Sequence, residues 1–223
     1  MKKLLSFLLM CLFASAASAA SMNLKVTEIY AGNSGDNNAT DDWIEITNYG
    51  TTAWDLETNP IYYDDGENNS LEAKTLKGLT SIAAGESVVY ILGTDDLTEF
   101  QSIWGTGVNA GYAKNGAGLG KSGDGVYLYT TNSADIASFT SITYPALPET
   151  LLSTMVANAN GDWDNNDVIF AQDGVLGAYQ SNSFVMNDTG ETATIIGSPG
   201  YVPEPASLSL MALAGMAALR RRK

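Results

Sequence analysis

The sequence contains no histidine and only one cysteine, Cys11. These absences exclude Ser-His-Asp triads, Cys-His pairs and histidine-ligated zinc, because each of these sites needs an imidazole. A disulfide within the chain is excluded as well, since it needs two cysteines. Carboxylates are therefore the only side chains left that could serve as acid–base groups.

Basic residues are also scarce. The chain carries 11 basic residues against 25 acidic ones, and six of the basic ones lie within residues 1–20 and 202–223. The central region therefore has a net charge of about −20, which argues against binding to nucleic acid or anionic lipid because phosphate contacts need Lys and Arg.

Helical periodicity is missing between residues 21 and 201, where no run of ten or more residues follows a helical pattern. Residues 97–104 and 151–157 could each form a short helical turn. Alternating runs rich in β-branched and aromatic residues recur instead, separated by turns rich in Gly, Asn and Asp. They predict an all-β sandwich or barrel with strands at residues 24–27, 43–47, 71–76, 87–92, 125–131, 136–144, 167–171, 184–186 and 193–196.

The first 20 residues have the pattern of a secretory signal peptide. Two lysines precede an apolar run over residues 4–14, and Ala17 and Ala19 match the A-x-A cleavage pattern. We expect cleavage after this pattern, which would also remove Cys11. The mature protein would then be exported without any thiol.

One loop has the composition of a calcium site. Asp162, Asp164, Asn166 and Asp167 provide oxygen ligands at close spacing, and Ca²⁺ prefers such ligands. The run is not an EF-hand, because its sixth and twelfth positions are Asp167 and Asp173 instead of Gly and Glu. Asp and Asn also fill turns for backbone reasons alone. Calcium is thus the one candidate cofactor, at this loop.

Four carboxylates could in principle supply the acid–base pair of a glycosidase, namely Glu28, Asp42, Glu45 and Asp55. Nothing in their spacing singles out a pair, so solvated strand faces and turns explain them better. We therefore predict no catalytic residue and a non-enzymatic protein.

Several short motifs resemble the lamin tail domain family, an immunoglobulin-like β-sandwich found in nuclear lamins and in exported bacterial proteins. The resemblance begins over residues 24–56, where a polar loop leads to Asp-Trp-Ile-Glu-Ile at 42–46, and continues at residues 83–89, 119–128 and 198–200. It implies an antiparallel sandwich over residues 21–201, with an insertion around residues 145–191.

The run Trp-Ile-Glu-Ile-Thr at residues 43–47 supports this fold independently. A period of two places Ile44 and Ile46 on one face, with Trp43, Glu45 and Thr47 on the other. We expect a half-buried antiparallel strand.

The last residues combine an apolar run at 206–219 with a basic end at 220–223. Fourteen apolar or small residues are fewer than the roughly 20 that a helix needs to cross a bilayer. An apolar run followed by basic residues is typical of a removable membrane anchor whose basic end stays on the cytoplasmic side.

Residues 202–223, with Pro203, Glu204 and Pro205 before the apolar helix, resemble the PEP-CTERM sorting signal of Gram-negative bacteria. The resemblance implies recognition by an exosortase, transient anchoring in the inner membrane by the C-terminal helix, and delivery to the cell surface or extracellular matrix. Such proteins often accompany exopolysaccharide production, which makes exopolysaccharide and matrix components candidate partners.

These features predict an exported, non-enzymatic structural or binding protein of the cell surface or biofilm matrix. Two alternatives remain: a calcium-dependent adhesin or carbohydrate-binding module, and a secreted hydrolase that uses carboxylates.

Overall fold

A computed structural model describes residues 23–32, 40–66, 70–133, 136–148, 150–164, 167–186 and 189–201. The expected signal peptide with Ala17 and Ala19, the sorting motif Pro203, Glu204 and Pro205, and Asn166 lie outside these residues. Within the described part of the chain, no helix is long and apolar enough to cross a membrane.

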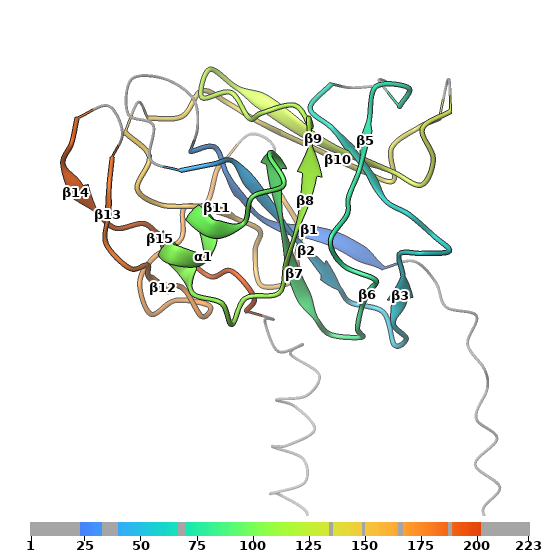
Figure 1. Ribbon diagram of the computed structural model, residues 1–223, viewed down its shortest axis with the longest axis horizontal. Helices are drawn as coiled ribbons and strands as arrows, with labels where there is room; N and C mark the ends of the chain where they lie inside the picture. Colours follow the sequence, from blue (N-terminus) through green and yellow to red (C-terminus); the bar gives the residue numbers. More distant parts are fainter. Residues whose placement is uncertain are drawn as a thin grey trace, which may run out of the picture.

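The larger sheet has five strands in the order β11-β1-β2-β7-β8 (Figure 1). Their bounds are Met155–Val156 for β11, Leu24–Tyr30 for β1, Trp43–Asn48 for β2, Ser87–Gly93 for β7 and Ala110–Lys114 for β8. All neighbours in this sheet are antiparallel except β7 and β8, which are parallel. A parallel pair needs a crossover, and the short helix α1, Thr98–Trp104, lies in this connection.

A second sheet has the order β10-β9-β4-β5, with bounds Thr140–Tyr144, Asp124–Tyr129, Tyr62–Asp64 and Lys74–Thr75. Three two-stranded sheets complete the domain. They are β3 with β6 (Trp54–Asp55, Ser81–Ile82), β12 with β15 (Tyr179–Gln180, Ile196–Gly197) and β13 with β14 (Phe184–Val185, Thr192–Ala193). Figure 1 shows β12 to β15 at the left end of the molecule, beside α1.

One apolar core joins the two larger sheets. It contains Ile44 and Val88 from the first sheet together with Val126, Leu128 and Ile142 from the second, all at most 4% exposed. Burying each of these side chains contributes about 1.5–3 kcal/mol relative to leaving it in water. The predicted all-β fold is thus confirmed, and its two larger sheets share a core as in a sandwich; the parallel pairing of β7 with β8 was not predicted.

The prediction that β2 is half-buried is wrong, because all six of its residues are buried. The apolar face of the strand packs as expected. Its other face is covered too: Trp43 makes edge-to-face contacts with Phe100 and Trp104, and Glu45 accepts a hydrogen bond from Gly200. Segments far away in the sequence supply this cover.

The two predicted helical turns had different outcomes. The turn at residues 97–104 is confirmed as α1. The turn at residues 151–157 is wrong, because β11 forms there and pairs with Glu28 and Ile29 of β1. The predicted strand at residues 167–171 is reduced to a single bridge between Phe170 and Met155.

Gly197 of β15 marks a close approach of the C-terminal region to the main sheet. A Cβ atom at this position would lie 2.8 Å from Glu28 Oε1 and 2.9 Å from side-chain atoms of Thr154 and Trp104. We expect Gly197→Ala to destabilise the domain by roughly 1–3 kcal/mol, because these buried neighbours must shift. At Gly107 a Cβ would meet nothing within 4 Å, so Gly107→Ala is the matched control. Thermal melting checks both variants, and equal melting temperatures would contradict the prediction.

Candidate functional site

Two glutamates lie opposite each other in the middle of the main sheet. Glu28 of β1 and Glu45 of β2 are register partners and are only 0% and 1% exposed. Neither has an ion-pair partner among the described residues. Buried carboxyl groups without such a partner need hydrogen bonds or a proton to offset the loss of water.

Glu28 is surrounded by donors. Its Oε1 accepts hydrogen bonds from Thr154 Oγ1 and from the Ser198 amide, the latter at 2.8 Å. Its Oε2 accepts from Ser198 Oγ at 2.9 Å. Three donors aimed at one carboxyl group favour its ionised form.

Glu45 lies at the start of a chain of hydroxyl groups. Its Oε2 accepts from the Gly200 amide at 2.6 Å, while its Oε1 lies 2.6 Å from Thr27 Oγ1. The chain continues from Thr27 to Thr47 at 2.8 Å and from Thr47 to Ser87 at 2.5 Å. Ser87 Oγ then donates to the carbonyl oxygen of Tyr201 at 3.1 Å.

Hydroxyl groups link Glu45 to the end of the described chain. Thr27 Oγ1 donates to Glu45 Oε1, and Ser87 Oγ donates to the Tyr201 carbonyl, which can only accept. Thr47 Oγ1 lies between Thr27 and Ser87, and in each of these two contacts either hydroxyl group could be the donor. The chain of hydroxyl groups therefore crosses β1, β2 and β7.

Electrostatics distinguishes the two glutamates by how far the pKa of each is raised. Burial raises the pKa of Glu28 to about 7. Burial, and after it the neighbouring Glu28, raises the pKa of Glu45 well above its ordinary range. Two carboxyl groups this close share their protons as a pair, and near neutral pH the pair retains at least one.

Besides Thr154 and Thr27, the partners of this pair come from one short segment. The amides of Ser198 and Gly200 and the carbonyl of Tyr201 bond to side chains of β1, β2 and β7, respectively. Residues 198–201, which we call the docked segment, thus lie across three strands of the main sheet. The ring of Tyr201 also packs on Gly177, where a Cβ would come within 2.2 Å of it. The expected sorting segment begins at the next residue.

A cavity of about 140 Å³ lies beside the docked segment. Glu45, Ser198 and Tyr201 contribute to its lining, and apolar side chains form much of the rest, among them Val156, Ile169, Phe170, Val175 and Leu176.

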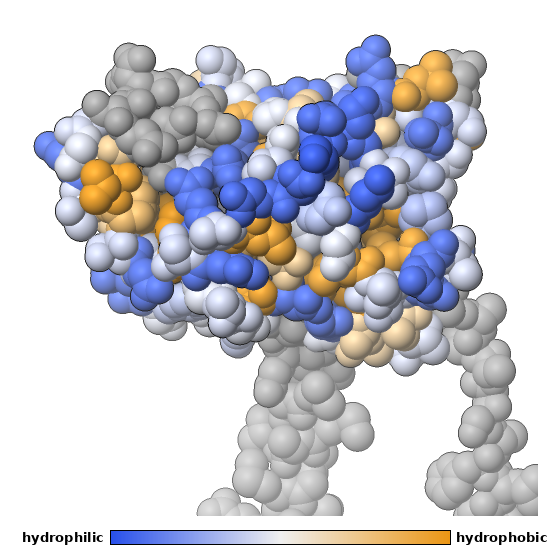
Figure 2. Space-filling model, viewed as in Figure 1, coloured by the Kyte–Doolittle hydropathy of each residue, from blue (hydrophilic) through white to orange (hydrophobic). Residues whose placement is uncertain are grey.

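Eight large apolar side chains of the described residues are exposed. All but Leu71 follow residue 150, namely Leu152, Ile169, Val175, Leu176, Tyr179, Val185 and Tyr201. In the view of Figure 2 hydrophobic residues form separate groups among hydrophilic ones.

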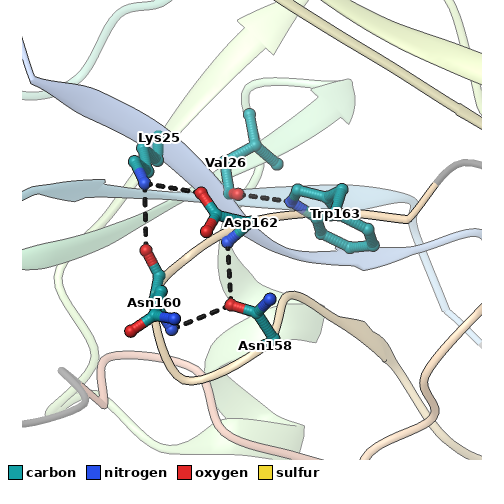
Figure 3. A network of polar contacts seen from close by, with 6 residues as sticks. All are labelled: Lys25, Val26, Asn158, Asn160, Asp162 and Trp163. Carbon is teal, nitrogen blue, oxygen red and sulfur yellow. Dashed lines mark hydrogen bonds and ion pairs between the residues drawn. The ribbon is translucent and has the colours of Figure 1, made fainter.

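The predicted calcium loop is held by a lysine (Figure 3). Lys25 Nζ lies 2.9 Å from Asp162 Oδ1 and donates to the Asn160 carbonyl at 2.9 Å. Asn158 Oδ1 accepts from the amides of Asn160 and Asp162 at 2.8 and 3.1 Å. The ammonium group of Lys25 therefore competes with a calcium ion for the Asp162 carboxylate.

The other predicted ligands add little to this picture. The Asp167 amide donates to the Asp164 carbonyl at 3.2 Å, and Asn166 lies outside the described residues. In the part of the chain that the structure describes, no three acidic, His or Cys side chains form a group that could hold a metal ion. The calcium site stays a prediction.

We expect Lys25→Met to strengthen calcium binding at this loop, because the ammonium group no longer competes for Asp162. Calorimetric titration of Ca²⁺ into the wild-type chain and this variant checks the expectation. Lys114→Met, which breaks the exposed ion pair with Asp95, is the control. Titrations without heat in all three chains would contradict the calcium prediction.

The remaining candidate carboxylates are separate from the pair. Asp42 Oδ2 accepts from the Leu119 amide at 2.8 Å, and Asp55 Oδ1 accepts from the amides of Glu57 and Thr58. Asp55, the last residue of β3, is exposed and caps the turn that follows, as expected. The expectation of solvated strand faces and turns is wrong for Glu28, Asp42 and Glu45, which are all buried. In the sequence, Ser198-Pro199-Gly200 indicates the fold through the family resemblance, but nothing in these residues indicates that they bond to the two glutamates.

Comparisons with known proteins support both resemblances. Residues 17–143 match the family model of the Lamin Tail Domain, and residues 202–223 match that of the PEP-CTERM protein-sorting motif. No curated protein and no solved structure matches the chain. Because the first match covers more than half of the sequence and agrees with the β-sandwich observed, the chain belongs to the lamin tail domain family and carries a PEP-CTERM sorting motif directly after its folded domain.

Proposed function

We propose that this protein is a non-enzymatic structural or binding component of the cell surface or extracellular matrix. An exosortase at the inner membrane would release it there by processing its sorting motif. One observation carries the proposal: residues 198–201, the last that the structure describes, bond to the main sheet, and the match to the sorting motif begins at residue 202. Processing within the motif would therefore leave every contact of the docked segment in place.

The state of the glutamate pair supports a role without catalysis. A glycosidase needs two carboxyl groups that reach a sugar. Glu28 and Glu45 are at most 1% exposed, and both oxygens of each already have partners within the domain. Their raised pKa values follow from burial, so these values do not indicate an acid–base site.

The region after the family match supports a role in binding. Exposed apolar side chains concentrate there, and such surfaces often mark sites of association. The acidic composition of the central region favours neutral or basic partners over anionic ones. Neutral polysaccharides and matrix proteins fit these conditions.

Mass spectrometry of the protein recovered from membrane, surface and medium fractions tests the proposal. We expect the surface form to begin after the Ala17–Ala19 pattern and to end near Pro203 to Pro205, with Tyr201 retained. Glu204→Ala should prevent processing, whereas Glu191→Ala, which changes an exposed glutamate of the domain, should not. A surface form that still carries Lys223 would contradict the proposal.

A further inference from the structure

We propose that Glu28 and Glu45 act as positioning residues for the sorting reaction: they hold the docked segment on the main sheet, and this segment must detach before an exosortase can process the motif. The inference rests on the proposed function. It adds that the folded domain itself controls access to the motif.

The docked segment is attached at three successive points. Ser198 bonds to Glu28 through both its amide and its hydroxyl group, at 2.8 and 2.9 Å. Gly200 bonds to Glu45 at 2.6 Å, and the Tyr201 carbonyl accepts from Ser87. The chain is therefore fixed to the sheet up to the residue that precedes the motif.

This attachment limits how far the folded domain can lie from the apolar run that follows the motif. Four residues, 202–205, separate Tyr201 from the apolar run that starts at residue 206. Fully extended, they span at most about 14 Å. With the apolar run in the bilayer, the attached domain is held within that distance of the membrane. An enzyme that recognises the motif as an extended segment, as in binding by strand addition, needs space beside the chain that a folded domain this close would occupy.

Detachment of residues 198–201 would roughly double the reach, to about 28 Å. Their attachment is suited to local opening. Gly200 is exposed and Tyr201 is 39% exposed, and three of the four hydrogen bonds named above end on the two glutamates. Local opening of such a segment requires less free energy than global unfolding. β15, which ends at Gly197, would keep its own pairing with β12.

Two changes to the full-length chain test this control. Ser198→Ala removes the hydroxyl donor to Glu28 Oε2 and keeps the amide donor. A flexible linker of about eight Gly and Ser residues between Tyr201 and Val202 supplies the reach without detachment. We expect processing about three- to tenfold faster in Ser198→Ala and at least as fast in the linker chain. Ser198→Ala should have no further effect within the linker chain, because reach is then no longer limiting.

Ile142→Val is the matched control, since it weakens the core at β10, away from the docked segment. It should leave the rate of processing unchanged, which separates positioning from general stability. Processing rates equal to wild type in both the Ser198→Ala and the linker chains would overturn the inference while the proposed function stands. A chain that is processed in none of its forms would overturn the proposed function and this inference with it.

Discussion

The melting temperature of the domain is expected to fall as the pH rises from about 4.5 to about 7, and Glu28→Gln is expected to remove the part of this fall that comes from Glu28. Burial raises the pKa of Glu28 from its ordinary value of 4.5 to about 7. Between these values the folded state binds more protons than the unfolded state, so stability decreases as the pH rises. The difference corresponds to about 3 kcal/mol, or roughly 6–12 °C in melting temperature for a domain of this size.

Other groups contribute to the same trend. Burial raises the pKa of Glu45 well above its ordinary range, and it also raises the pKa values of Asp41, Asp65 and Glu99, so part of the fall remains in Glu28→Gln. Burial, and after it the charges of neighbouring carboxyl groups, raises the pKa values of Tyr49 and Tyr179 above the ordinary tyrosine value, so both stay neutral over this range. The difference between wild type and Glu28→Gln at each pH isolates the contribution of Glu28.

Glu45→Gln tests the other member of the pair. A glutamine there can accept from the Gly200 amide and donate to the rotatable hydroxyl group of Thr27. Because the pKa of Glu45 is raised well above its ordinary range, we expect this variant to remove the Glu45 share of the fall in stability and to keep the share of Glu28. The same pH dependence in wild type, Glu28→Gln and Glu45→Gln would contradict the assignment of the fall to this pair.

The second large effect concerns the docked segment. A chain that ends at Tyr201 should be as stable as the full-length chain, whereas one that ends at Gly197 should lose about 3–5 kcal/mol. The shorter chain removes both Ser198 donors to Glu28 and the amide donor to Glu45. A buried carboxylate without these donors is strongly destabilising. Urea unfolding at pH 8, where Glu28 is ionised, measures the difference.

Combining the shorter chain with Glu28→Gln provides the internal check. The loss should shrink, because a neutral amide is less costly to leave without its partners than a charge. Equal stability of the chains that end at Tyr201 and Gly197 would contradict the role assigned to the docked segment.

Long strands could be predicted from the sequence, and very short ones could not. The runs at residues 24–27 and 43–47 alternate, and residues 87–92 form a nearly continuous apolar run of strand length, which is enough to identify β1, β2 and β7. Two-residue strands such as β3, β11 and β12 have no period to recognise, because pairing with a distant partner alone defines them. For this reason the local pattern of residues 151–157 predicts a helical turn, although β11 forms there.

The parallel pairing of β7 with β8 could not be predicted from the sequence either. The sequence of β8, Ala-Gly-Tyr-Ala-Lys, has weak strand character, and a Cβ at Gly111 would lie 2.3 Å from the Lys77 carbonyl. Its place in the sheet depends on this close approach and on the crossover through α1. Neither constraint is visible in local patterning.

The sequence by itself determined the all-β class, the family and the place of the sorting motif, because these depend on local alternation and on contiguous motifs. Alternation in β2 also placed Glu45 correctly on the face opposite Ile44 and Ile46. Only the tertiary structure decided that this face is buried and that its carboxyl groups hold the end of the domain. The physical reason is distance along the chain: the Ser198 amide that donates to Glu28 is 170 residues away, and the Gly200 amide that donates to Glu45 is 155 residues away. A strand pattern cannot tell whether water or another segment will cover its polar face.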